Sequence, residues 1–145
     1  NQSKNFLLSE KKSEIYDNNF LKHWSNNIFK ITQNINQFIQ VEKNNSTKCY
    51  GYGSPTKATL LLKTTLLTQF DLDFIVEDNV HKVGKFLPKT GIPILSTKDI
   101  DFKKSAVIII LAWNFSDDII KKLKKLYQVP FKIIIPLPKL KVLNL

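Results

Sequence analysis

The chain has 145 residues, about the length of one domain, and its 43% hydrophobic content is enough for a buried core. With 4 glycines, 6 prolines and 11% aromatic residues, it is neither collagen-like nor disordered. The longest apolar run, Ala106 to Trp113, is far short of the ~20 residues that span a bilayer, and no signal-peptide pattern opens the chain. The single Cys49 excludes an internal disulfide and a multi-cysteine metal site. We expect a soluble cytoplasmic domain with no membrane partner.

The charge balance, 22 basic against 12 acidic residues, gives a net charge of +10 and favours anionic ligands. Every basic residue is lysine, whereas proteins that read nucleic-acid bases rely heavily on arginine. The densest cluster, between Lys121 and Lys125, falls on a predicted amphipathic helix and is typical of a solvated face. We therefore expect a small phosphate-bearing ligand and no nucleic acid.

The chain contains no methionine, so we expect it to be a piece of a longer protein. Residues 1–16 are polar and predicted to be flexible, and residues 17–46 are predicted to form an amphipathic connecting helix. The apolar stripe of this helix has residues three or four apart: Phe20, Trp24, Ile28, Ile31, Ile35 and Phe38. The stripe could join two copies of the chain or a partner, but we favour its packing on the sheet, whose two faces both need covering helices.

Residues 47–145 alternate predicted strands and helices. The strands are expected at 48–52, 72–76, 92–95, 106–112 and 131–135, the last being the final strand. The helices are expected at 55–68 and 117–127, with N-caps at Ser54 and Ser116 and one or two further turns within 97–103. This rhythm predicts an α/β fold: a Rossmann-like parallel sheet of about five strands, ordered 3-2-1-4-5, with flanking helices.

A glycine-containing turn between the first strand and its helix is the strongest candidate for binding chemistry. It comprises Gly51, Tyr52, Gly53, Ser54, Pro55, Thr56 and Lys57. Glycines permit a tight turn and a close ligand, a helix N-terminus offers free N–H groups, and lysine adds positive charge. Thr56 stands where the dinucleotide fingerprint has its third glycine, and P-loop spacing is absent. A turn that merely connects strand to helix remains the alternative.

Two further segments follow strands that end at the same edge of the predicted sheet. Glu77, Asp78 and Asn79 stand where Rossmann-like folds place an acid on a ribose. Trp113, Asn114 and Phe115 could stack on a base or hold a sugar. For each segment an ordinary structural role remains open. The two histidines and Cys49 form no catalytic or metal-binding set.

From Tyr50 to Pro138 the sequence resembles the C-terminal domain of S-adenosylmethionine-dependent nucleoside-diphosphate-sugar C-methyltransferases. Four blocks carry the resemblance: Gly51 to Lys57, Val76 to Asn79, His81 to Pro88 with Gly91 to Ile94, and Leu111 to Phe115. They occur in the order and spacing of the family. The ending from Ile135 to Pro138 also fits.

The resemblance implies a complete enzyme with a zinc-binding N-terminal module, a central domain that holds S-adenosylmethionine and the catalytic residues, and this C-terminal domain. The chain has neither the glycine-rich methyl-donor motif nor a cysteine cluster. We therefore assign it no catalytic residue, no metal ligand and no cofactor of its own. We expect S-adenosylmethionine in the central domain, which would be a partner of this chain, and no catalysis by this chain alone.

The implied ligand is a nucleoside-diphosphate sugar, linked to thymidine diphosphate. We expect the backbone amides around Ser54 and the Lys57 side chain to hold the pyrophosphate, and Asp78 or Asn79 to hold the ribose. Trp113 and Asn114 would line the sugar or the domain interface. The loop that contains Lys82 and Phe86 would close over the site. Two alternatives stay open: an independent NAD(P)-binding module, and a non-enzymatic interaction domain that self-associates through the Phe20–Phe38 stripe.

Overall fold

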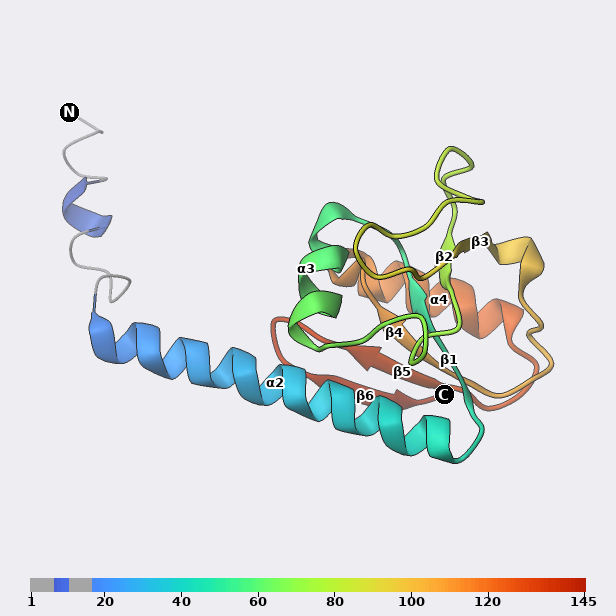
Figure 1. Cartoon of the computed structure of the whole chain (residues 1–145), viewed down its shortest axis with the longest axis horizontal. Helices are drawn as coiled ribbons and strands as arrows, with labels where there is room; N and C mark the ends of the chain where they lie inside the picture. The colour runs from blue at the N-terminus through green and yellow to red at the C-terminus, as the bar shows by residue number, and fades with distance from the viewer. Residues whose placement is uncertain (1–6, 11–16) are drawn as a thin grey trace. The chain divides into compact units, whose positions relative to one another are not determined.

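The computed structural model describes residues 7–10 and 17–145, which fall in two compact units, residues 1–31 and residues 32–145. Residues 7–10 are helical, and the rest of the segment predicted to be flexible lies outside the described residues. Helix α2 (Asn18–Asn44) confirms the predicted long helix (Figure 1). Within the first unit, the side chains of Phe20 and Trp24 are 38% and 59% exposed.

The second unit contains a six-stranded sheet ordered β3-β2-β1-β4-β5-β6 (Figure 1). Its strands are β1 (Lys48–Tyr52), β2 (Ile75–Glu77), β3 (Ile94–Ser96), β4 (Ala106–Ile110), β5 (Lys132–Ile135) and β6 (Lys141–Asn144). The first five are parallel, which confirms the predicted fold class and strand order.

Strand β6 pairs antiparallel with β5 and was not predicted. The expectation that the strand stopped by Pro136 would be the last was wrong. The prolines do end β5, but the chain then reverses and adds an edge strand. Of its four residues, only Leu143 is half-buried while the other three are exposed, so the strand carries little hydrophobic pattern for a sequence to show.

Helix α3 (Thr56–Thr64) and helix α4 (Ser116–Leu126) connect β1 to β2 and β4 to β5. Helix α3 is shorter than predicted, because Leu66 adopts a positive φ of 58° soon after its end. Ser116 is the first residue of α4 rather than its N-cap, since the 3-10 turn Trp113–Phe115 leads directly into the helix. The turns predicted within 97–103 reduce to the single 3-10 turn Thr97–Asp99.

Helices α3 and α4 cover opposite faces of the sheet (Figure 1). Alternate side chains of β1, including Tyr50 and Tyr52, face α4 and join one core with its Leu123. The hydroxyls of Tyr50 and Tyr127 are hydrogen-bonded to each other inside this core. The two faces are thus covered as a doubly wound parallel sheet requires.

The carboxyl half of α2 packs within the second unit. Ile35 of the predicted stripe is fully buried and its Phe38 is half-buried, so this half of the stripe faces the core as predicted. Ile39, which lay outside the predicted stripe, is fully buried too. The Asn36 amide nitrogen donates to the carbonyl of Thr65, just after α3, at 2.8 Å. Lys132 Nζ of β5 donates to Glu42 Oε1 at 2.6 Å. These contacts join the carboxyl half of α2 to the end of α3 and to β5.

Candidate functional site

Two glycines, Gly51 within β1 and Gly53 just after it, are explained by packing against the residues that follow β4. Gly53 has a φ of +84°, and a Cβ added to it would lie 2.6 Å from the Cβ of Ala112. A Cβ on Gly51 would lie 2.7 Å from Cδ1 of Leu111. A side chain at Gly53 would therefore clash with the fixed Ala112 Cβ, whereas a side chain at Gly51 would require the Leu111 side chain to shift. The glycines let β1 and the segment after β4 approach closely, which is a structural role that needs no ligand.

Ser54 binds the carboxylate of Glu77. Its amide and its hydroxyl both donate to Glu77 Oε2, at 2.9 and 2.5 Å. The prediction that Ser54 caps α3 was wrong, since the N-cap is Pro55 and has no side-chain cap bond. The Ser54 side chain is oriented toward the neighbouring strand end instead of its own helix.

The other oxygen of Glu77 accepts the amide N–H groups of Asp78 and Asn79, at 3.0 and 3.1 Å. Lys82 Nζ lies 3.6 Å from Oε2. Burial of the Glu77 carboxyl opposes its ionisation, but the hydrogen bonds from Ser54 and Asn79 and the Lys82 charge outweigh burial and lower its pKa. A carboxylate of the chain itself therefore already occupies the anion-binding groups predicted at Ser54.

Lys57 and Trp113 meet across the point where the strand order reverses. Between β1 and β4 the connections run in opposite directions, and open α/β sheets bind ligands in the crevice at such a point. Lys57 Nζ lies 3.9 Å from the centroid of the Trp113 ring, in a cation–π contact. Both side chains are half-buried, and the neighbouring Asn114 is exposed. The structure thus brings together these residues predicted from two separate segments.

Asp78 is paired by a residue that the sequence interpretation placed on a solvated face. One of its oxygens accepts a hydrogen bond from Tyr52 Oη at 3.0 Å, and the other accepts one from Lys122 Nζ at 2.5 Å. Burial works against the Lys122 charge, but the Asp78 and Tyr52 oxygens outweigh it and raise the pKa of Lys122. The side chain of Asn79 accepts the His81 amide at 3.0 Å. No sequence signal linked Lys122 to Asp78, because they lie on different elements far apart in the chain.

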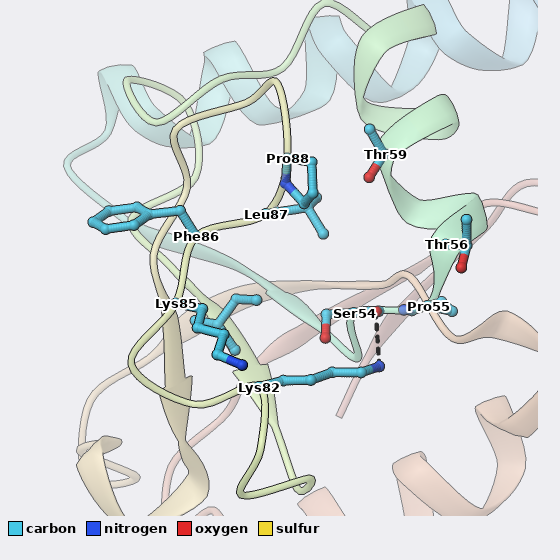
Figure 2. Close-up of a pocket in the computed structure, with 10 residues that line it drawn as sticks. Ser54, Pro55, Thr56, Thr59, Lys82, Lys85, Phe86, Leu87 and Pro88 are labelled. Carbon is cyan, nitrogen blue, oxygen red and sulfur yellow. Dashed lines mark hydrogen bonds between the residues drawn. The ribbon is translucent and has the colours of Figure 1, made fainter.

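A pocket of about 330 Å³ opens between the start of α3 and the loop that follows β2 (Figure 2). Its lining residues are Ser54, Pro55, Thr56, Thr59, Lys82, Lys85, Phe86, Leu87, Pro88 and Ile94. Lys82 Nζ donates to the Ser54 carbonyl at 3.0 Å, and the Phe86 ring points away from α3 (Figure 2).

Five of the residues predicted for the site line this pocket: Ser54, Pro55, Thr56, Lys82 and Phe86. Lys57, Asp78, Asn79, Trp113 and Asn114 are not among its lining residues. The sequence interpretation missed Thr59 and Lys85. The spacing of Thr56 and Thr59, one helical turn apart on α3, was a signal that could have found Thr59.

In residues 7–10 and 17–145, no group of three His, Cys, Asp or Glu side chains is placed to hold a metal ion. None of the helices that the structure describes is both long enough and apolar enough to cross a membrane. Cys49 is fully buried in β1. Burial is the main cause that raises the pKa of its thiol to about 12.

A family model described as the C-methyltransferase C-terminal domain matches residues 1–138. The chain therefore belongs to the C-methyltransferase C-terminal domain family, which confirms the resemblance seen in the sequence. The C-methyltransferase NovU of Streptomyces niveus is 33% identical over 94 residues, 65% of this chain and 22% of NovU. The match thus spans less than a quarter of the length of this curated relative.

Proposed function

We propose that this chain holds the nucleoside-diphosphate sugar substrate of a sugar C-methyltransferase, with thymidine diphosphate as the nucleotide. Its membership of the C-methyltransferase C-terminal domain family supports a role in such an enzyme. The net charge of +10 favours a ligand with a diphosphate. The methyl transfer itself belongs to a separate central domain, which is a proposed partner of this chain.

The observation that carries the proposal is the convergence of strand ends. The turn after β1, the Glu77 cluster after β2 and Trp113 after β4 all lie at the carboxyl edge, where open α/β sheets bind their ligands. Lys57 lies in the first turn of α3. Lys82 lies in the loop after β2, which lines the pocket at the start of α3. We place the diphosphate between these two lysines, and the sugar beside Trp113 and Asn114.

S-adenosylmethionine supplies the methyl group in enzymes of this class. The turn after β1 does not fit that cofactor, because the Ser54 amide and hydroxyl already bind Glu77. The residues of this chain are assigned to binding and orienting the sugar nucleotide only.

Calorimetric titration of the chain with thymidine diphosphate, NAD and tripolyphosphate tests the proposal. We expect saturable binding of thymidine diphosphate that NAD does not match. Lys57→Ala should weaken it several-fold with the fold intact, because a cation beside the diphosphate is lost. Preferred binding of NAD would support an independent dinucleotide module instead. Absence of binding to every probe would contradict the proposal.

Exposed aromatic side chains favour a second candidate function, an interaction module. Phe20 and Trp24 continue the stripe that is buried at Ile35, yet they are 38% and 59% exposed. The partner would be the central domain or a second copy of this chain. Sedimentation velocity should then show self-association or capture of the central domain, and charged residues at Trp24 and Ile31 should abolish it. If the chain stays monomeric and does not bind the central domain, this second function is contradicted.

A further inference from the structure

The pocket between α3 and the loop after β2 has room for a small ligand or for one half of a larger one. Its volume of about 330 Å³ lies near the lower end of the ~300–1,000 Å³ typical of ligand sites. Figure 2 shows Leu87 and Pro88 facing Thr59 of α3 across the pocket, with Lys82 and Lys85 at one end.

The lining of the pocket combines an apolar wall with polar groups, some of which have no hydrogen-bond partner among the residues described. Pro55, Leu87, Pro88 and Ile94 supply the apolar surface. The hydroxyls of Thr56 and Thr59 have no hydrogen-bond partner within the part of the chain that the structure describes. Such a lining suits a flat ring whose edge carries hydrogen-bonding groups.

The two lysines differ in how far their charges are already matched. Lys82 Nζ binds the Ser54 carbonyl at 3.0 Å and lies 3.6 Å from Glu77. Lys85 has no ion pair among the described residues. Its ammonium group is exposed at one end of the pocket and has no carboxylate partner there in residues 7–10 and 17–145, so it would attract a phosphate group.

We infer that this pocket receives the nucleoside of the sugar nucleotide, with the base against Leu87, Pro88 and Ile94 and Lys85 on the diphosphate. The inference rests on the proposed function and adds to it the place and the orientation of the ligand. The hydroxyls of Thr56 and Thr59 hydrogen-bond the edge of the base or the ribose.

This placement differs from the ribose site predicted at Asp78. Both carboxylate oxygens of Asp78 are already used, by Tyr52 and by Lys122. A ribose there would share these oxygens with both partners. Within the described part of the chain, the threonine hydroxyls and Lys85 of the pocket have no partner with which a ligand would compete.

The experiment is a calorimetric titration of the full chain with thymidine diphosphate, thymidine and inorganic pyrophosphate. Thr59→Phe fills the pocket from the helix side, Lys85→Gln removes its unmatched charge, and Asp78→Asn tests the other ribose site. Lys63→Gln is the matched control, since it makes the same charge change at an exposed position of α3 outside the pocket. Circular dichroism and thermal midpoints verify that each variant is folded.

We expect Lys85→Gln to raise the Kd for thymidine diphosphate about fivefold, the size of one partly exposed ion pair. Thr59→Phe should raise it more than about tenfold, while Lys63→Gln and Asp78→Asn change it by less than about twofold. If Lys85→Gln and folded Thr59→Phe bind normally, or pyrophosphate binds as tightly as the nucleotide, the inference is overturned and the proposed function stands. If the unaltered chain binds no nucleotide, the inference and the proposed function are both contradicted.

Discussion

Ser54 and Glu77 are joined through a single carboxylate oxygen: the amide N–H and the hydroxyl of Ser54 both donate to Glu77 Oε2. The pair locks the turn after β1 to the end of β2. It also means that the negative charge expected from a ligand at this turn is already supplied by the protein.

This pair predicts a pH-dependent stability. The pKa of Glu77 is lowered in the folded chain, so its contribution is present above the unfolded pKa of ~4.3 and is lost as the pH falls through the folded value. At pH 7, Glu77→Gln should lower the free energy of unfolding by about 1–3 kcal/mol. In urea unfolding at several pH values, the difference in free energy of unfolding between the unaltered chain and Glu77→Gln should shrink as the pH falls below about 4. A difference that does not change with pH would show that the charge of Glu77 contributes nothing to stability.

Gly53→Ala should be strongly destabilising, because it combines a positive φ with a clash at Ala112. We expect a loss of about 3 kcal/mol or more in urea unfolding. Gly84→Ala is the matched control, since its φ is +80° but nothing lies within 4 Å of the added Cβ. It should lose only about 1 kcal/mol. Ala112→Gly should recover part of the Gly53→Ala loss, and equal losses at the two glycines would contradict the packing argument.

Cys49 should be unreactive in the folded chain. Its thiol pKa of about 12 leaves only about one molecule in ten thousand as thiolate at pH 8. A chromogenic disulfide reagent should react at a rate set by unfolding, and the rate should rise steeply in urea. Prompt labelling without denaturant, as fast as that of the urea-unfolded chain, would show that the interior of β1 opens freely.

The Glu42–Lys132 ion pair should stabilise the junction of α2 with β5. The Glu42 side chain is only 8% exposed, and Lys132 Nζ lies 2.6 Å from it. Lys132→Met should lower the free energy of unfolding by about 3 kcal/mol, because it leaves a buried carboxylate unpaired. Adding Glu42→Gln to Lys132→Met should restore part of the loss. Additive effects in this double-mutant cycle would mean that the two residues do not interact.

The sequence showed the parallel sheet because its signals are local. Ala106 to Ile110 form a continuous apolar run, which a strand buried on both faces requires, and all five residues are buried. The turn after β1 was also visible, since Gly53 marks it. The weakly patterned β6 was not visible.

The partners of the candidate site residues could not be predicted, because they come from distant parts of the chain. The Ser54 hydroxyl hydrogen-bonds Glu77 instead of capping its own helix, and Lys122 of α4 hydrogen-bonds Asp78. Such choices depend on three-dimensional distances between strand ends, which neither periodicity nor motif spacing encodes. Lys85 was inside a recognised block, but only the structure shows that its charge is unmatched.

The connection between β2 and β3 has a consequence for how this fold can diversify. Parallel neighbours are usually joined through a crossover helix, but here residues 78–93 contain none, and Lys82 to Pro88 of this loop form one wall of the pocket beside α3. A loop tolerates insertions and deletions far better than a packed helix does. Changes in its length or side chains can therefore resize the pocket while every strand pairing is kept. Related chains could acquire new ligand preferences through this one loop, with the sheet unchanged.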